Sequence, residues 1–176
     1  MKLKILVNSA INFSINRVIE IFGISVLIAG FLLLSSLVTF SPDDPNFIFP
    51  SNTQIKNILG FRGSFTSDIF FQSFGLISLL IPFSLIASGV NIILNKKILI
   101  LIESIFYTIF YSLIGSLFFS FFYPLAFKLY INGNGGFIGM YLKTTFLNSI
   151  ISINPQISYY IFALLISFLF LISIQF

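Results

Sequence analysis

The sequence predicts an all-α integral membrane protein, a four-span helical bundle with two exported loops that carry short interfacial helices. Of its 176 residues 57% are hydrophobic and only 8% are charged, and the mean hydropathy is +1.07. Soluble domains, in comparison, carry about 25% charged residues. Four apolar runs are each long enough to cross a bilayer as a helix. A chain of this length holds one such bundle and is too short to add a soluble catalytic domain.

The composition also limits the chemical reactions and the binding partners that this chain can have. The sequence contains no Cys and no His, which excludes disulfides, iron–sulfur clusters and thiol catalysis. The net charge of +4 is spread over loops, a pattern that suits anionic lipid headgroups better than a nucleic-acid groove. We therefore expect no cofactor, no metal site and no direct binding of nucleic acid, and we expect the lipid bilayer as a partner.

The first span is predicted at residues 18–40, which as a helix would measure about 34 Å against a hydrocarbon core of about 30 Å. It is too long for a signal-peptide core and lacks a small-residue cleavage site, so we expect it to remain as an anchor. Residues 1–16 are expected to form a separate, short interfacial helix. Arg17 and Glu20 are three residues apart and should pair at the membrane surface; a transport role for Glu20 is the alternative.

The first exported loop, residues 41–68, opens with a sequence that stops a helix: Ser41, Pro42, Asp43, Asp44 and Pro45. The prolines lack a backbone donor, and the two carboxylates mark the point where the chain enters water or headgroups. A metal site or an acid–base pair is the alternative interpretation of the two carboxylates, but no His or Cys exists to complete it. A short surface helix is expected to follow and to end at Gly60.

The second span is predicted at about 69–94, with Asp68 at its N-terminus and a kink at Pro82. The next span, about 98–123, follows after only Asn95-Lys96-Lys97, so the two spans must form an antiparallel hairpin. The two lysines place this turn in the cytoplasm by the positive-inside rule. With four spans, both termini would then be cytoplasmic.

Small hydroxyl side chains recur every four residues along the third span, at Ser104, Thr108, Ser112, Ser116 and Ser120, with Gly115 beside them. Such a face lets helices approach closely and hydrogen-bond, so we expect it to pack on another span. A polar conduit is the alternative. Glu103 shares a helix face with Lys96 two turns away, which favours pairing or snorkelling over proton carriage.

The second exported loop is predicted at about 124–156. It contains a glycine-rich turn with Gly135, Gly136 and Gly139, followed by a semi-apolar segment that fits an interfacial or re-entrant helix. The glycines do not form a phosphate loop, because no G-K-[ST] follows at the required spacing. The last span, about 157–176, stops at Phe176 without a flanking charge, so we expect the natural sequence to continue.

Several of these segments resemble, in order and at similar spacing, the N-terminal four-helix membrane domain of FtsK/SpoIIIE-type DNA translocases. The segments are S-P-D-D-P-N-F, I-K-N-I-L-G-x-x-G with Gly60 and Gly63, S-D-I-F-F-Q-S-F-G-L with Asp68 and Gly75, the later Pro82, and G-G-F-I-G with Gly135, Gly136 and Gly139. The family often has Trp in the first loop; this chain has none, and Phe47 stands where an aromatic residue is expected.

The resemblance implies a membrane anchor and interaction domain that tethers a cytoplasmic, ATP-driven DNA motor and takes part in cell division and chromosome partition. It also implies the bacterial inner membrane, the division septum, self-association, and contact with other division proteins. The motor would lie downstream, so this chain would be no enzyme, and it would have no catalytic residues. A small transporter or channel that uses Glu20, Glu103 and the row of hydroxyl groups is the alternative function.

Overall fold

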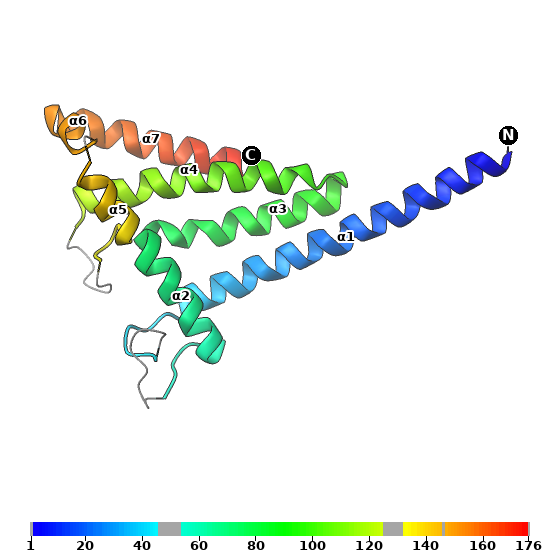
Figure 1. Ribbon diagram of the computed structural model, residues 1–176, viewed down its shortest axis with the longest axis horizontal. Coiled ribbons are helices and arrows are strands. Elements are labelled where there is room, and N and C mark those ends of the chain that lie inside the picture. The colour runs from blue at the N-terminus through cyan, green and yellow to red at the C-terminus, as the bar shows by residue number, and fades with distance from the viewer. Residues whose placement is uncertain (1, 46–53, 125–131, 146, 176) are drawn as a thin grey trace.

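The computed structural model describes residues 2–45, 54–124, 132–145 and 147–175 (Figure 1). In chain order its elements are α1 (Lys2–Val38), α2 (Gly60–Phe74), the 3₁₀ helix η1 (Gly75–Leu80), α3 (Ile81–Asn95), α4 (Leu99–Phe122), α5 (Gly136–Lys143), α6 (Leu147–Ile153) and α7 (Pro155–Ser173). Four helical segments within the described ranges are long and apolar enough to cross a membrane: Asn8–Val38, Gly60–Asn95, Leu99–Phe122 and Pro155–Ser173. The predicted class, an all-α protein with four spans, is confirmed.

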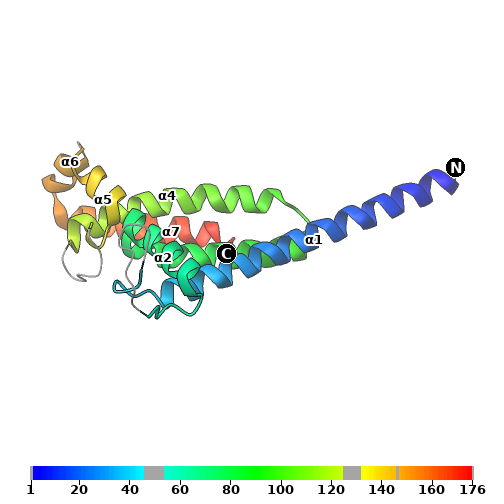
Figure 2. The same ribbon diagram turned by 60° about the horizontal axis from the view of Figure 1, so that its bottom comes forward.

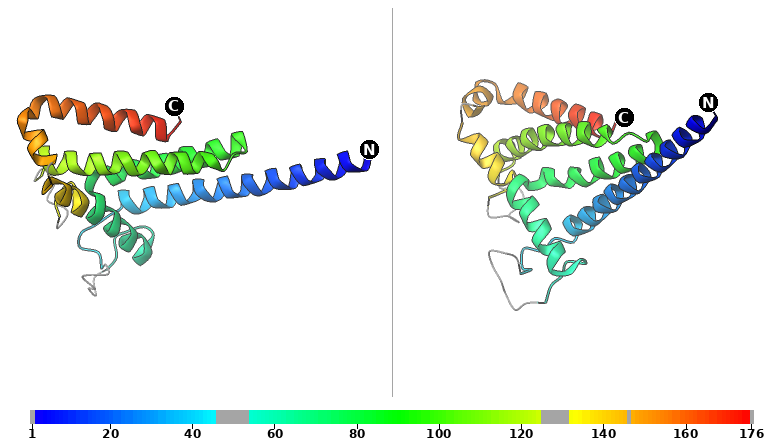
Figure 3. Two further views of the ribbon diagram at one scale, coloured as in Figure 1. Left: turned by 45° about the horizontal axis from the view of Figure 1, so that its top comes forward. Right: turned by 45° about the vertical axis from the view of Figure 1, so that its right-hand side comes forward.

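The long helices lie side by side in a row, in the order α1, α3, α4 and α7 (Figures 1 and 3). The turn between α3 and α4 marks one end of the row, which we call the hairpin end. The opposite end, the loop end, carries α2, α5 and α6. There α2 runs obliquely from α1 toward α5 and connects the two sides of the row.

The first helix departs from expectation, because residues 2–38 form one continuous helix rather than an interfacial helix followed by a span. No proline occurs in this segment and its first glycine is Gly23, so nothing in the sequence ends the helix at residue 16. The N-terminal part of α1 extends well beyond the hairpin end (Figures 1 and 2).

Glycines allow α1 and α3 to pack closely. A methyl group added to Gly30 would lie 2.8 Å from Ile86 Cγ1, and one added to Gly89 would lie 2.7 Å from the Leu27 backbone. Small residues at such positions let transmembrane helices approach until their backbones are nearly in contact. This close packing fixes the position of α1 relative to α3.

The first loop and second span also correct two predictions. No helix ends at Gly60; instead Gly60, with φ of +63°, is the first residue of α2. Asp68 therefore lies in the middle of α2, buried, and not at a helix N-terminus. The second span changes direction at η1, which begins at Gly75 with φ of +71°, while Pro82 takes the first turn of α3, where its missing N–H breaks no helical hydrogen bond.

The second loop contains two short helices, α5 and α6, in place of one interfacial segment. The last span begins where Asn154-Pro155 predicts a break: the Asn154 side chain accepts a hydrogen bond from the Ile157 backbone N–H at 3.1 Å, and Pro155 is the first residue of α7. Phe47 lies outside the described residues.

Candidate functional site

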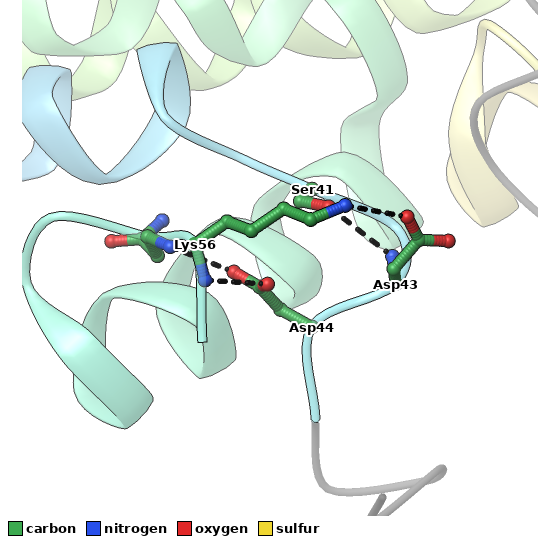
Figure 4. A network of polar contacts seen from close by, with 5 residues as sticks. Ser41, Asp43, Asp44 and Lys56 are labelled. Carbon is green, nitrogen blue, oxygen red and sulfur yellow. Dashed lines mark hydrogen bonds and ion pairs between the residues drawn. The ribbon is translucent and has the colours of Figure 1, made fainter. Parts of the chain in front are cut away.

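The two adjacent aspartates of the first loop have different environments (Figure 4). Asp44 is 3% exposed, and its carboxylate accepts hydrogen bonds from the backbone N–H groups of Lys56 at 2.8 Å and Asn57 at 2.9 Å. Asp43 lies at the surface, where Lys56 Nζ donates to its Oδ2 at 2.8 Å. This hydrogen bond and the charge of Asp43 raise the pKa of Lys56 above its ordinary value. The Asp44 carboxylate therefore holds the end of the first loop in place through the backbone N–H groups of Lys56 and Asn57.

Asn57, next to these contacts, joins the loop to the helices beneath it. It is 4% exposed; its Nδ2 donates to the Ser36 carbonyl at 2.9 Å, and its Oδ1 accepts from the Leu59 N–H at 3.1 Å. Ser36 Oγ in turn donates to the Gly63 carbonyl at 2.6 Å. A methyl group on Gly63 would lie 2.0 Å from Asn57 Oδ1, so only glycine allows this close contact. We call Ser36, Asp44, Asn57 and Gly63 the acidic-loop cluster.

Glycines of the second loop meet Gly75, at the start of η1, at a second place, which we call the glycine junction: Gly75, Gly135, Gly136 and Gly139. The Leu76 N–H donates to the Asn134 carbonyl at 2.9 Å. A methyl group on Gly75 would lie 1.9 Å from that same carbonyl, and one on Gly136 would lie 2.6 Å from the Gly75 nitrogen. Residues that are about sixty positions apart in the sequence thus touch backbone to backbone.

The hydroxyl side chains that recur along α4 are called the hydroxyl row: Ser104, Thr108, Ser112, Ser116 and Ser120. The C-terminal end of the hydroxyl row packs against the glycine junction. Ser116 Oγ donates to the Phe74 carbonyl at 2.9 Å, and methyl groups on Gly135 and Gly139 would lie 2.3 and 2.1 Å from the Ser116 carbonyl. Ser120 is 7% exposed, and its carbonyl accepts from Lys143 Nζ at 3.0 Å. The hydroxyl row is therefore in contact with α5 and with the last residue of α2 at the loop end.

Ser104 and Ser112 of the hydroxyl row are also buried, as is the neighbouring Gly115, whereas Thr108 is partly buried. A methyl group on Gly115 would lie 2.4 Å from Ile77 Cγ1. Ser104 Oγ donates to the Ser173 carbonyl at 2.7 Å, which ties α4 to α7. Ser112 is 1% exposed, and its Oγ has no partner in the described part of the chain.

The two glutamates that would serve a transport path lie apart from this row. Glu20 forms ion pairs with Arg17 and with Lys96, and so links α1 to the end of α3. The predicted Arg17–Glu20 pair is confirmed, but Lys96 pairs with Glu20 and not with Glu103. Glu103 is exposed on α4, whereas the neighbouring Ser104 is buried.

Neither cluster at the loop end has the composition of a catalytic or metal centre. Within residues 2–45, 54–124, 132–145 and 147–175, no three His, Cys, Asp or Glu side chains come together. What the arrangement provides chemically is rigidity: charge-assisted hydrogen bonds to backbone N–H groups and glycine contacts that hold the second loop against the second span.

Sequence reasoning placed the acidic turn in the first loop, Gly135, Gly136 and Gly139 in the second loop and Gly75 in the second span. It missed Ser36, Asn57 and Asn134, which complete the contacts of these residues. Asn57 offered a signal, since Asn commonly bonds its own backbone two residues on and introduces a turn. Ser36 and Asn134 offered none, because the partners of Ser36 lie 21 and 27 residues away in the chain and Leu76, the partner of the Asn134 carbonyl, lies on another element.

Comparison with known proteins gives one consistent result. The family model of the 4TM region of DNA translocase FtsK/SpoIIIE matches residues 16–176. The protein named DNA translocase FtsK of Rickettsia bellii (strain RML369-C) is 38% identical over 64 residues, which cover 36% of this chain and 8% of the relative. The protein of that name in Rickettsia prowazekii (strain Madrid E) is 29% identical over 82 residues, 45% of this chain and 11% of the relative.

These matched segments span only about a tenth of the length of the curated relatives. No solved structure matches the chain. The family model nevertheless covers nearly all of the sequence, including both loops, the last three candidate spans in full and the first from residue 16 on. The chain is a multi-pass membrane protein and belongs to the family of the 4TM region of DNA translocase FtsK/SpoIIIE.

Proposed function

We propose that this chain is the membrane anchor and interaction domain of a DNA translocase that acts in cell division and chromosome segregation. The observation that carries the proposal is the glycine junction, where family-like glycines of the second loop meet Gly75, the family-like glycine between α2 and α3. Because Gly75 and Gly136 lie in backbone contact, the second loop is held against the second span and forms a preformed surface with it at one end of the four spans. A rigid composite surface suits recognition of other membrane or exported proteins better than it suits chemistry.

In this proposal the hairpin end is cytoplasmic and the loop end is exported, in the bacterial inner membrane. Arg17, Lys96 and Lys97 lie at or near the hairpin end, which agrees with the positive-inside rule. Because the chain has no Cys, single cysteines report topology directly. Gln54→Cys should react with an impermeant maleimide from outside the cell, and Lys97→Cys should react only after the membrane is permeabilised.

The proposed place of action is the division septum, with self-association and contacts to other division proteins. A fluorescent fusion of residues 1–176 should concentrate at midcell in dividing cells. Gly136→Ala, which disrupts the glycine junction, should leave the fusion in the membrane but spread it around the cell. Gly60→Ala is the matched control, because a methyl group there meets nothing within 4 Å. Uniform distribution of the unaltered fusion contradicts the proposal.

The chain itself performs no catalysis and binds no nucleic acid in this proposal; both belong to a motor carried by other parts of the translocase. The transporter alternative has no observation in its favour. Glu20 is already engaged by two cations, and Glu103 is exposed away from the buried hydroxyl row.

A further inference from the structure

A groove of about 420 Å³ lies between α1 and α2, beside the acidic-loop cluster. Its α1 wall is apolar and includes Ala29, Leu32 and Leu33, and its α2 wall includes Arg62 and Thr66. The groove has no part in the glycine junction. Its volume falls within the range of pockets that hold small molecules or single lipid chains, about 300–1,000 Å³.

The walls of the groove occupy different positions along two candidate spans. Ala29, Leu32 and Leu33 belong to the apolar span Asn8–Val38, between one and three turns from its end. Arg62 belongs to the first turn of α2, directly after the first loop, and thus to the outermost turn of the candidate span Gly60–Asn95. A cation at the end of a span and apolar side chains farther inside the neighbouring span follow the order of polarity in a phospholipid.

Arg62 is the one cation among the described residues that line this groove. It is exposed, and its guanidinium makes no hydrogen bond, ion pair or ring contact within the described part of the chain, although its backbone carbonyl accepts from Thr66 Oγ1. Its neighbours Ile58 and Phe61 are 75% and 52% exposed, as expected where side chains enter lipid. An arginine between such neighbours is placed to bind a phosphate, because its planar group donates two parallel hydrogen bonds to phosphate oxygens.

We propose that this groove is a binding site for an anionic glycerophospholipid of the leaflet at the loop end. One acyl chain lies against Ala29, Leu32 and Leu33, and the phosphate is held by Arg62. Charge complementarity and the polarity gradient favour this ligand over an apolar side chain of a second copy, which would leave the guanidinium without a partner. The site fixes the angle between α1 and α2, and thus the position of the first loop, through a bound lipid.

The test is retention of lipid by the purified chain, taken from nanodiscs that contain equal amounts of phosphatidylglycerol and phosphatidylcholine. Native mass spectrometry should show one retained phosphatidylglycerol per chain and little phosphatidylcholine. Arg62→Ala should weaken the retention of phosphatidylglycerol about tenfold, the loss expected for a charge-assisted, two-pronged contact. Arg62→Lys should give a smaller loss. Lys97→Ala, which removes the same charge at the hairpin end, should bind as the unaltered chain does.

A second variant tests the acyl-chain part without changing charge. Ala29 is exposed, so Ala29→Phe should fold normally, fill the groove and displace the lipid. The proposal is overturned if Arg62→Ala and Ala29→Phe both retain phosphatidylglycerol as the unaltered chain does. It is also overturned if a photoreactive phosphatidylglycerol labels neither groove wall, or if the groove cross-links to a second copy of the chain. Septal localisation does not enter these measurements, so failure here leaves the proposed function untouched.

Discussion

At the scale of single residues, the first loop shows how two identical neighbouring side chains acquire different roles. Asp44 is buried and satisfies two backbone N–H groups that no helix or sheet serves, whereas Asp43 makes an exposed ion pair. A buried charge-assisted hydrogen bond contributes more to stability than an exposed ion pair, and its removal leaves donors without partners.

Replacement of Asp44 by Ala should therefore lower the free energy of unfolding by about 3 kcal/mol, because two buried backbone donors lose their acceptor. Asp43→Ala is the matched control, with an expected loss below about 1 kcal/mol, as for other exposed ion pairs. Unfolding in detergent, followed by circular dichroism, measures both. Equal losses for the two variants would show that the buried contacts of Asp44 do not hold the loop.

The Asp43–Lys56 pair also predicts a dependence on pH. The pKa of Lys56 is raised above its ordinary value of 10.5 in the folded protein, first by the hydrogen bond to Asp43 and then by its charge. The contribution of the pair is thus fully present below pH 10.5 and is lost as the pH rises through the higher pKa of the folded state. Limited proteolysis of the first loop should accelerate only in that alkaline range, and Lys56→Gln should remove the change with pH.

Gly139 is a third residue whose role can be measured. A methyl group there would lie 2.1 Å from the Ser116 backbone carbonyl, so Gly139→Ala must push α5 away from α4, at a cost of about 3 kcal/mol. Gly60→Ala adds the same methyl group in open space and should cost only the strain of its positive φ, about 1 kcal/mol. Protease should cleave the second loop faster in Gly139→Ala and at an unchanged rate in Gly60→Ala.

At the scale of elements, the sequence predicts those features that depend on interactions between residues close together in the chain. The apolar runs, the Asn154-Pro155 helix start and the two-lysine hairpin all follow from length, capping and the absence of breakers. The start of α2 did not follow, because Asp44 holds the backbone of Lys56 and Asn57 from twelve and thirteen residues away and delays the helix until Gly60. A hydrogen-bond partner twelve or thirteen residues away does not alter the local pattern of apolar and polar residues, so this pattern cannot predict the contact.

The link between α1 and α3 gives a prediction at this scale. Glu20 is the shared partner of Arg17 and Lys96, two cations on different helices. Glu20→Gln should lower the melting temperature of the protein in detergent clearly more than Glu103→Gln does, because Glu103 makes no ion pair in the described part of the chain. The comparison also tests the transporter alternative, for which Glu103→Gln should abolish ion flux in reconstituted vesicles.

At the scale of the whole molecule, the spans form an open row, and the sequence could not predict this. Four apolar helices, of which only the second and third are joined by a short turn, are compatible with a closed bundle as well as with a row. Tertiary contacts such as Gly30 on Ile86 and Gly89 on Leu27 decide between the closed bundle and the row. The sequence does not indicate these contacts, because each span is apolar on nearly all of its faces. Local reasoning likewise could not predict the contact of Gly75 with the glycines of the second loop, although these glycines themselves carried the family resemblance.

The protruding start of α1 has no packing partner among the described elements, and Ile11, Phe13 and Ile15 are 50% to 60% exposed. An isolated helix of about fifteen residues is only marginally stable without tertiary contacts. Amide hydrogen exchange in residues 8–16 should therefore be faster by orders of magnitude than in residues 23–37, which pack on α3. Equal protection would mean that lipid or a second chain covers this part of α1.

The row consists of two closely packed helix pairs, α1 with α3 and α4 with α7, and the direct contact between α3 and α4 is less extensive than either. At the loop end the glycine junction joins one pair to the other by backbone contacts. Farther toward the hairpin end the pairs are joined by side-chain hydrogen bonds: Ser84 on α3 bonds Tyr111 on α4 and Ser173 on α7, and Asn91 on α3 donates to the Ile174 carbonyl at the end of α7. A force that separates the pairs at the hairpin end must therefore break these hydrogen bonds before it reaches the backbone contacts of the glycine junction.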